Sequence, residues 1–452
     1  NSAEANGVGS ADAEASGEAN ALARGIFVDV PMVNGGTDYD YSFSNSGDIY
    51  VAALAQLQNS ANANASGGDA WATASGTNVE ATATGIRIIG GDFNGAIFND
   101  GDIFVSAIGN SINSASVVAS DDAKAVAIGS AYAYANGIDF YSTGSSYGYS
   151  EVDGDLLNEG DITVGATALV SNIASAEGDR AWAYAGLDDD GDEYNQANAS
   201  AYGFYGDFST IFGNFENSGD ITVSANAVSR NEATAQGVAD ANASASASAS
   251  ATAVGLEINA YSISGDVTNS GAITVSAAAI TTSKANAVAQ SGSAVAYAYM
   301  DTASAEATGL SVDVETIAGS FSNSGDISVH STAAAIISAT ATGRGYAYAY
   351  GSADDVDADA VGVDFWAYSL GGDFTNTGDI TVVADASYAV TAKAKALESG
   401  DAYADIGAWS AEATATGLYV RIQDVLEGNF DNSGAISVHA IASVCAHATA
   451  TG

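Results

Sequence analysis

The side chains best able to do chemistry in this chain are carboxylates. The densest run, residues 188–193, reads Asp-Asp-Asp-Gly-Asp-Glu, and a second acidic run covers residues 354–359. Calcium takes carboxylate oxygens as ligands, although the first run lacks the spaced terminal Glu of a helix–loop–helix calcium loop. A solvated acidic loop is the alternative interpretation. The sequence therefore suggests Ca²⁺ as its one candidate cofactor, with possible ligands Asp188, Asp190, Asp192, Glu193, Asp355 and Asp357.

Enzymatic interpretations find little support in the remaining residues. The chain has three histidines, and none falls into a His–Ser–Asp or metal-ligand spacing. Paired carboxylates could cut polysaccharides, but acid pairs occur throughout the chain and single out no site. We therefore predict a protein that is not an enzyme and has no catalytic residues. The one cysteine, Cys445, excludes an internal disulfide, and we expect it to be a small buried residue.

The charge balance limits the partners. Ten basic residues against 55 acidic ones give a net charge of −45, which repels nucleic acid and anionic membrane surfaces. No run of about 18 apolar residues could span a membrane. The sequence starts at Asn1 without a signal peptide, so we expect a processed product or a part of a longer chain. Expected partners are divalent cations, glycans or other copies of this chain, without nucleic acid and without membrane insertion.

One short phrase recurs eight times: apolar–x–Asn–x–Gly–Asp/Ala–Ile–x–Val. Such self-similarity indicates a stacked repeat protein, in which each unit buries its apolar face against its neighbours. We therefore expect residues 1–452 to form one continuous array without separate domains. The phrases occupy residues 43–51, 97–105, 156–164, 215–223, 267–275, 321–329, 374–382 and 430–438.

Two polar columns run through the phrase. The Asn is predicted to hydrogen-bond backbone groups that a sharp turn leaves unpaired. The Asp that follows the Gly becomes Ala at Ala272 and Ala435. Its role is therefore more consistent with turn formation than with calcium binding. The predicted structural ladder consists of Asn45, Asn99, Asn158, Asn217, Asn269, Asn323, Asn376 and Asn432.

Glycines recur at a shorter spacing inside each module. From Gly219 they recur at Gly237, Gly255 and Gly271, in steps of 18, 18 and 16 residues. We therefore predict an all-β, parallel β-solenoid (β-helix) of eight modules of about 55 residues, each made of three coils of about 18 residues. The rival geometry is a single 55-residue coil per module. It would need strands of up to about 18 residues, well beyond the usual length.

Alternation along the strands predicts which side chains face inward. Ile221 and Val223 alternate with polar residues, and residues 239–253 place alanine at every second position. The sequence thus predicts a thin, alanine-rich core. Aromatic residues fall in the outward register and should form an exposed stripe, which would be an interaction surface. We expect lateral packing of filaments there, with sugar stacking or isolated surface tyrosines as alternatives. The stripe comprises Trp71, Tyr132, Tyr134, Trp182, Tyr184, Tyr297, Tyr299, Tyr346, Tyr348, Tyr350, Tyr403 and Trp409.

The phrase Phe321-Ser-Asn323-Ser-Gly325-Asp-Ile327 resembles the repeats of bacterial filamentous-haemagglutinin-type and autotransporter passenger β-helices. The resemblance implies a secreted, right-handed parallel β-helix that works at the cell surface as an adhesin or fibre. Residues 1–7 also resemble residues 446–452, so the last coil is in phase to continue into a copy of the first.

From these patterns we predict a structural extracellular fibre or filament protein. It would self-assemble through uncapped end coils and through lateral aromatic and acidic surfaces. The alternative is a calcium-loaded surface adhesin shaft that binds glycans.

Overall fold

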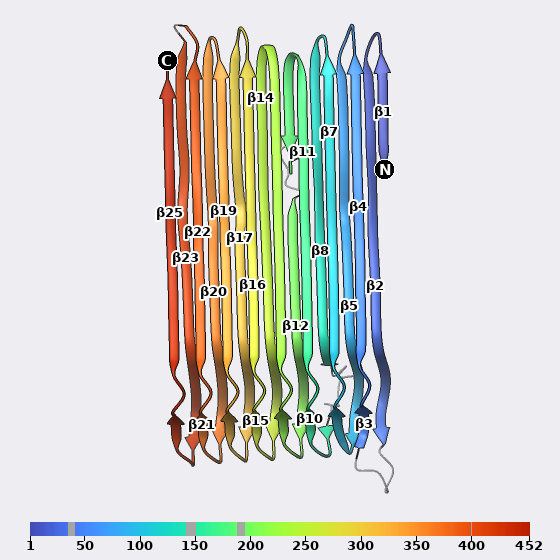
Figure 1. Ribbon diagram of the computed structural model, residues 1–452, viewed down its shortest axis with the longest axis vertical. Coiled ribbons are helices and arrows are strands. Elements are labelled where there is room, and N and C mark those ends of the chain that lie inside the picture. Colours follow the sequence, from blue (N-terminus) through green and yellow to red (C-terminus); the bar gives the residue numbers. More distant parts are fainter. Residues whose placement is uncertain (35–40, 142–150, 188–194, 399) are drawn as a thin grey trace.

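The computed structural model describes residues 1–34, 41–141, 151–187, 195–398 and 400–452, and within them only strands, turns and bends occur. Paired strands run parallel, and each coil lies against the next from the N-terminal to the C-terminal end of the stack (Figure 1). The chain is therefore an all-β parallel β-solenoid, as the repeat predicted.

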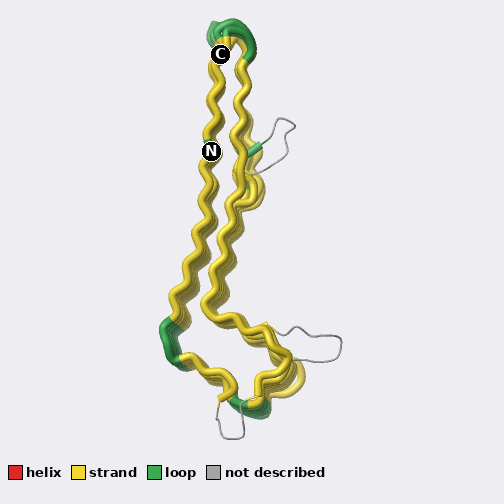
Figure 2. The backbone as a smooth tube through the Cα atoms, turned by 90° about the vertical axis from the view of Figure 1, so that its right-hand side faces the viewer, coloured by secondary structure: helices red, strands yellow, loops and turns green. Residues whose placement is uncertain are grey.

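One coil follows a long, narrow path. In one example, β16 (Ile273–Ala289) rises to a tight turn and β17 (Ser293–Ile317) returns beside it. The short strand β18 (Phe321–Asn323) then leads to the next coil. Figure 2 shows the two long arms lying against each other and opening into a wider lobe at the lower end. The molecule is therefore a slab with two broad faces, each built from one class of long strand.

The three classes of strand recur along the chain. The first long strands are β1 (Ser2–Gly7), β4 (Ile49–Ala65), β7 (Ile103–Ala119), β16, β19 (Ile327–Gly343), β22 (Ile380–Ala396) and β25 (Ile436–Thr451). The second long strands are β2 (Ala11–Asn34), β5 (Ala70–Asn94), β8 (Asp122–Tyr141), β12 (Gln196–Ile211), β17, β20 (Tyr346–Leu370) and β23 (Asp401–Leu426), with β9 (Glu151–Val152) beside them. Both classes are joined in β11 (Ile162–Ala185) and β14 (Ile221–Ile263). The short strands are β3 (Tyr41–Asn45), β6 (Ala96–Asn99), β10 (Leu156–Asn158), β13 (Phe215–Asn217), β15 (Val267–Asn269), β18, β21 (Phe374–Asn376) and β24 (Phe430–Asn432).

The predicted 18-residue coil is wrong. Ile221 pairs with Ile273, and Ile273 with Ile327, so one whole module separates equivalent residues in adjacent coils. First strands reach 17 residues and second strands 26. Strand length is limited in globular domains by the width of the core, whereas here each strand pairs with a near-copy on either side. The stack is consequently short along its axis, about 4.8 Å per coil.

The regular glycine spacing has a different cause, because Gly219, Gly237 and Gly255 mark three corners of a single coil. Gly219 lies in the lower turn before β14, and Gly237 precedes the upper turn. Gly255 lies opposite the next coil, where an added Cβ would sit 2.5 Å from the Gly309 carbonyl oxygen and 2.5 Å from Cγ2 of Ile273. The second strand approaches its neighbours too closely there for any side chain.

Alanine fills the narrow part of the slab, as predicted. Ala241, Ala243 and Ala245 are buried on the second strand, and Ala225 and Ala227 are buried on the first. Small side chains on both inner faces let the two sheets lie close together. The wider lobe holds the bulky residues instead, including Phe321 and Phe374, whose rings stack with centroids 4.8 Å apart.

Candidate functional site

The predicted asparagine ladder is continuous over the eight coils. Each Asn side chain from Asn45 to Asn376 donates one hydrogen bond to the Oδ1 of the Asn in the next coil, at 2.7 to 2.8 Å. Its second N–H bonds the carbonyl of the Gly two residues later, as Asn217 does with Gly219 at 3.0 Å. Because Asn217 and Asn323 are fully buried, these bonds satisfy groups that no solvent reaches. The ladder is structural.

The aspartate of the phrase caps the neighbouring coil. The Asp161 carboxylate accepts the backbone N–H of Asp220 at 2.9 Å, and the Asp220 carboxylate accepts that of Ala272 at 2.8 Å. The residue that receives the cap contributes only its N–H, so Ala272 and Ala435 can receive it as an Asp does, although an Ala has no carboxylate with which to cap the next coil. This explains why Ala replaces Asp in two copies, and it supports turn formation as the role of the column.

A second asparagine ladder was missed by the sequence reasoning. Asn59, Asn113, Asn172 and Asn231 are buried, and they bond one another across successive coils at 2.9 to 3.0 Å. Each lies 14 residues after an Asn of the first ladder, and each interrupts the inward aliphatic register. That fixed spacing was the signal that could have revealed it.

The second ladder faces a bulge in the second strand. In β5 the pairing shifts between Gly76 and Val79, and Asn78 has a φ of 57°. Strand β5 nevertheless continues through residues 75–78. Asn59 donates to the Ser75 carbonyl at 2.6 Å, so the ladder supplies donors to carbonyls at the irregular segment.

The proposed calcium ligands receive no support from the described residues. Asp188, Asp190, Asp192 and Glu193 lie outside them. Asp355 is exposed and Asp357 half-buried on β20. Burial, followed by the Asp355 and Glu412 charges, raises the pKa of the Asp357 carboxyl. Among the residues that the structure describes, no three Asp, Glu, His or Cys side chains are grouped to hold a metal ion.

The aromatic residues lie outward on the second strands, but they do not form one stripe of twelve. Nine of them lie between the upper turn and the bulge. Tyr132 and Tyr134 lie beyond the bulge on their strand, and Trp409 lies at the bulge. These three residues are therefore separated along the strand direction from the other nine. We call the remaining nine the aromatic stripe: Trp71, Trp182, Tyr184, Tyr297, Tyr299, Tyr346, Tyr348, Tyr350 and Tyr403.

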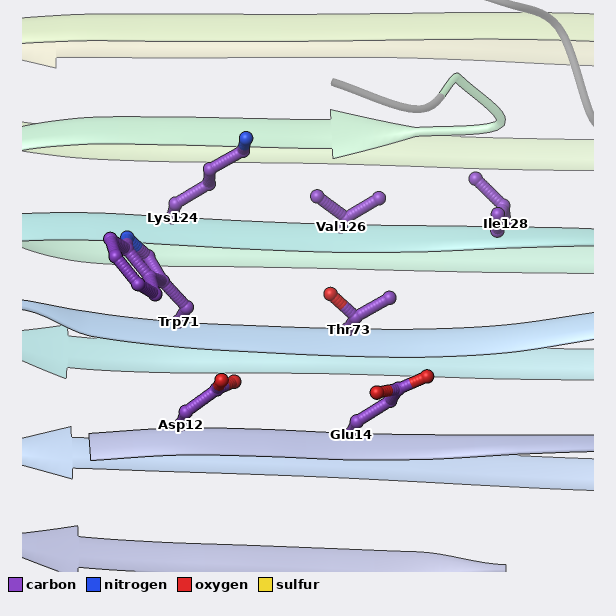
Figure 3. Close-up of a pocket in the computed structure, with 7 residues that line it drawn as sticks. All are labelled: Asp12, Glu14, Trp71, Thr73, Lys124, Val126 and Ile128. Carbon is purple, nitrogen blue, oxygen red and sulfur yellow. The ribbon is translucent and has the colours of Figure 1, made fainter. Parts of the chain in front are cut away.

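The stripe begins in an open hollow of about 560 Å³ on β2, β5 and β8. Its centre is the Trp71 indole, 50% exposed, whose strand neighbours in register are Asp12 and Lys124. Figure 3 shows the carboxylates of Asp12 and Glu14 on one side of the indole and the Lys124 ammonium on the other. The hollow thus combines a flat apolar ring with hydrogen-bond acceptors and a donor.

Towards its other end the stripe forms a tyrosine cluster on β17 and β20, and Tyr403 of β23 lies beside it, 5.8 Å from Tyr346. The Tyr297 and Tyr299 rings stack with centroids 5.8 Å apart, and Tyr350 lies 5.7 Å from Tyr299. Burial, followed by the neighbouring tyrosines, raises the pKa of the Tyr299 hydroxyl, so it stays protonated. The cluster presents phenol edges rather than a deep cavity. Only Trp71 and Tyr403 of the stripe are more than about a third exposed.

The expected burial of Cys445 is wrong. Cys445 is exposed: it occupies an outward position of β25, opposite Ala389 of β22, on a strand whose residues are all exposed. No helix among the described residues has the length and apolar character that a membrane span requires. No protein-family model matches the chain, and comparison with curated proteins and with solved structures gives no match. Its function must be argued from these surfaces.

Proposed function

We propose that this chain is the structural shaft of an extracellular, cell-surface fibre, with other coils of the same kind as its main partner. The observation that supports this is the unbroken axial bonding. Every coil repeats the parallel backbone ladder, the first asparagine ladder runs through all eight phrases, and aspartates cap the turns in most coils. The resemblance of the repeated phrase to haemagglutinin-type and autotransporter β-helices supports a location at the cell surface.

The mechanism would be mechanical. A load along the stack axis acts on backbone hydrogen bonds that lie parallel to that axis. The first long strands that carry these bonds are themselves 17 residues long. An edge strand such as β25 carries a row of unpaired backbone groups in the register of the repeat. Another coil can add there, either from a second copy or from further chain, so elongation repeats the contact already made between coils.

Electron microscopy of the purified chain tests this proposal. We expect filaments with an axial repeat of about 4.8 Å. Ala450→Pro in β25 removes a backbone donor that faces the next coil, as the N–H of the inward Ile380 faces Ala435, and should block elongation. Ala450→Val keeps this donor and should not block elongation, because Val117 fills the equivalent position of β7. Filaments that form equally well from the proline variant would refute end-to-end stacking.

The second candidate function is a glycan-binding adhesin shaft, and the hollow around Trp71 favours it. A sugar ring could stack on the indole while its hydroxyls bond Asp12, Glu14 and Lys124. Trp71→Ala and Trp182→Ala should then abolish binding on a glycan array, whereas Trp409→Ala should leave it unchanged. Trp409 is the matched control because it is 75% exposed but lies outside the stripe.

Calcium loading belongs to this alternative. Chelation should make the rods collapse if the acidic run at residues 188–193 binds the ion, and rods that keep their shape in a chelator would remove calcium from the proposal.

A further inference from the structure

The two broad faces of the slab differ sharply in charge. The second long strands together carry 25 acidic and 5 basic residues. The first long strands, at residues 2–7, 49–65, 103–119, 162–178, 221–237, 273–289, 327–343, 380–396 and 436–451, carry four of each sign, so their formal charges cancel. We call the outward side of these first strands the neutral face. Its charged residues are Glu4, Glu177, Glu232 and Asp385 with Arg230, Lys284, Lys393 and Lys395.

The neutral face is also flat and partly apolar. Most of its outward residues are Ala, Ser, Thr and Asn, which leave little relief above the sheet. Exposed apolar side chains stand among them on several coils, including Leu54 at 61% and Ile336 at 54% exposure. Tyr50 and Phe104 stack on each other there at 4.9 Å. A broad, partly apolar face without net charge, on a protein of charge −45, indicates an interaction surface.

We propose that the neutral face binds the neutral face of a second copy of this chain, sheet against sheet. The available area is sufficient. A strand of 17 residues and a stack of eight coils cover about 2,000 Å² at roughly 3.3 Å per residue and 4.8 Å per strand. A stable interface needs about 800 Å² from each partner. Even partial overlap of the two faces would therefore suffice.

Electrostatics selects this pairing over the alternatives. Stacked sheets lie about 10 Å apart, so pairing through the neutral faces keeps the two acidic faces about 30 Å apart. That distance is several Debye lengths at physiological ionic strength, where the Debye length is about 8 Å. Pairing through the aromatic stripe would instead bring two acidic faces within about 10 Å. Lateral packing therefore uses the face opposite the stripe, in contrast to the sequence-based expectation, and it leaves the stripe free.

Sedimentation velocity on matched variants tests the proposal. Leu54→Glu with Ile336→Glu adds two charges to the neutral face. Leu22→Glu with Tyr261→Glu adds the same charge at apolar residues exposed to 60% and 62% on the second-strand side. We expect the wild type and the control to associate side by side. The dissociation constant of the neutral-face variant should be more than about a hundredfold higher than that of the wild type, because like charges meet at a symmetric interface.

Three outcomes would overturn the proposal: a wild type that never associates laterally, equal weakening by both double variants, or a neutral-face variant that associates like the wild type. Far-UV circular dichroism on every variant separates dissociation from unfolding. The result is distinguishable from failure of the fibre proposal. Filaments one slab thick would keep end-to-end stacking and remove the lateral contact, whereas paired slabs that do not elongate would do the reverse.

Discussion

Asn217→Ala removes one link from the middle of the first asparagine ladder. The Asn217 side chain donates to the Gly219 carbonyl at 3.0 Å and to Asn269 Oδ1 at 2.7 Å, and it accepts from Asn158 Nδ2 at 2.7 Å. Alanine leaves three buried polar groups each short of a partner. An unsatisfied buried group costs about 1–3 kcal/mol, so for three groups we expect a loss of about 3–9 kcal/mol, confined to the coils on either side.

Asn432→Ala is the matched control, because it makes the same kind of bonds in a solvent-exposed coil. Asn432 donates to Gly434 at 3.1 Å and accepts from Asn376 at 2.7 Å. Water can replace those bonds in the 452-residue chain, so the loss should stay near or below about 1 kcal/mol.

The assay must be local, because stacked repeats do not unfold as one unit. Hydrogen exchange of the amides in β13, β14 and β15 reports the opening free energy of the affected coils. The reasoning is refuted if Asn217→Ala and Asn432→Ala lower local protection by the same amount. Burial of the ladder would then contribute nothing beyond what exposed bonds contribute.

The bend glycines and the acidic face give two further predictions. Gly203→Ala should destabilise the stack by about 1–3 kcal/mol in urea unfolding, because the added Cβ would lie 2.4 Å from the Gly255 carbonyl oxygen and 2.6 Å from Ile221 Cγ2. Gly165→Ala should be neutral, since the atom nearest to its added Cβ would be 3.5 Å away. Equal effects of the two substitutions would contradict the steric account. Burial raises the pKa of the Asp139, Asp207 and Asp364 carboxyls above the ordinary 3.8. Their charged forms are therefore penalised in the fold, and the melting temperature should rise as the pH falls from 7 towards those raised values; a melting temperature that falls over this interval would contradict the assignment.

The repeat and the strand parity could be predicted from the sequence because both are local. Near-identical modules that stack in register place Asn over Asn, so the ladder from Asn45 to Asn432 followed from the recurrence of one phrase. Period-two alternation separates inward from outward side chains without knowledge of the partner strand. For the same reason the alanine-lined, thin core could be expected before the path of the chain was known.

The tertiary structure alone decided the coil length and everything that depends on it. A glycine is equally suited to a turn, as Gly237 is, and to a close approach between strands, as Gly255 is, so glycine spacing could not distinguish three short coils from one long coil. The bulge near Gly76 shifts the register without a clear sequence signal and moved Tyr132 and Tyr134 out of the stripe. With long coils, all first strands share one face of the slab and all second strands the other. That assignment separates a neutral face from an acidic one. Composition gives the net charge of −45, but the distribution of that charge over the two faces depends on which strands lie side by side.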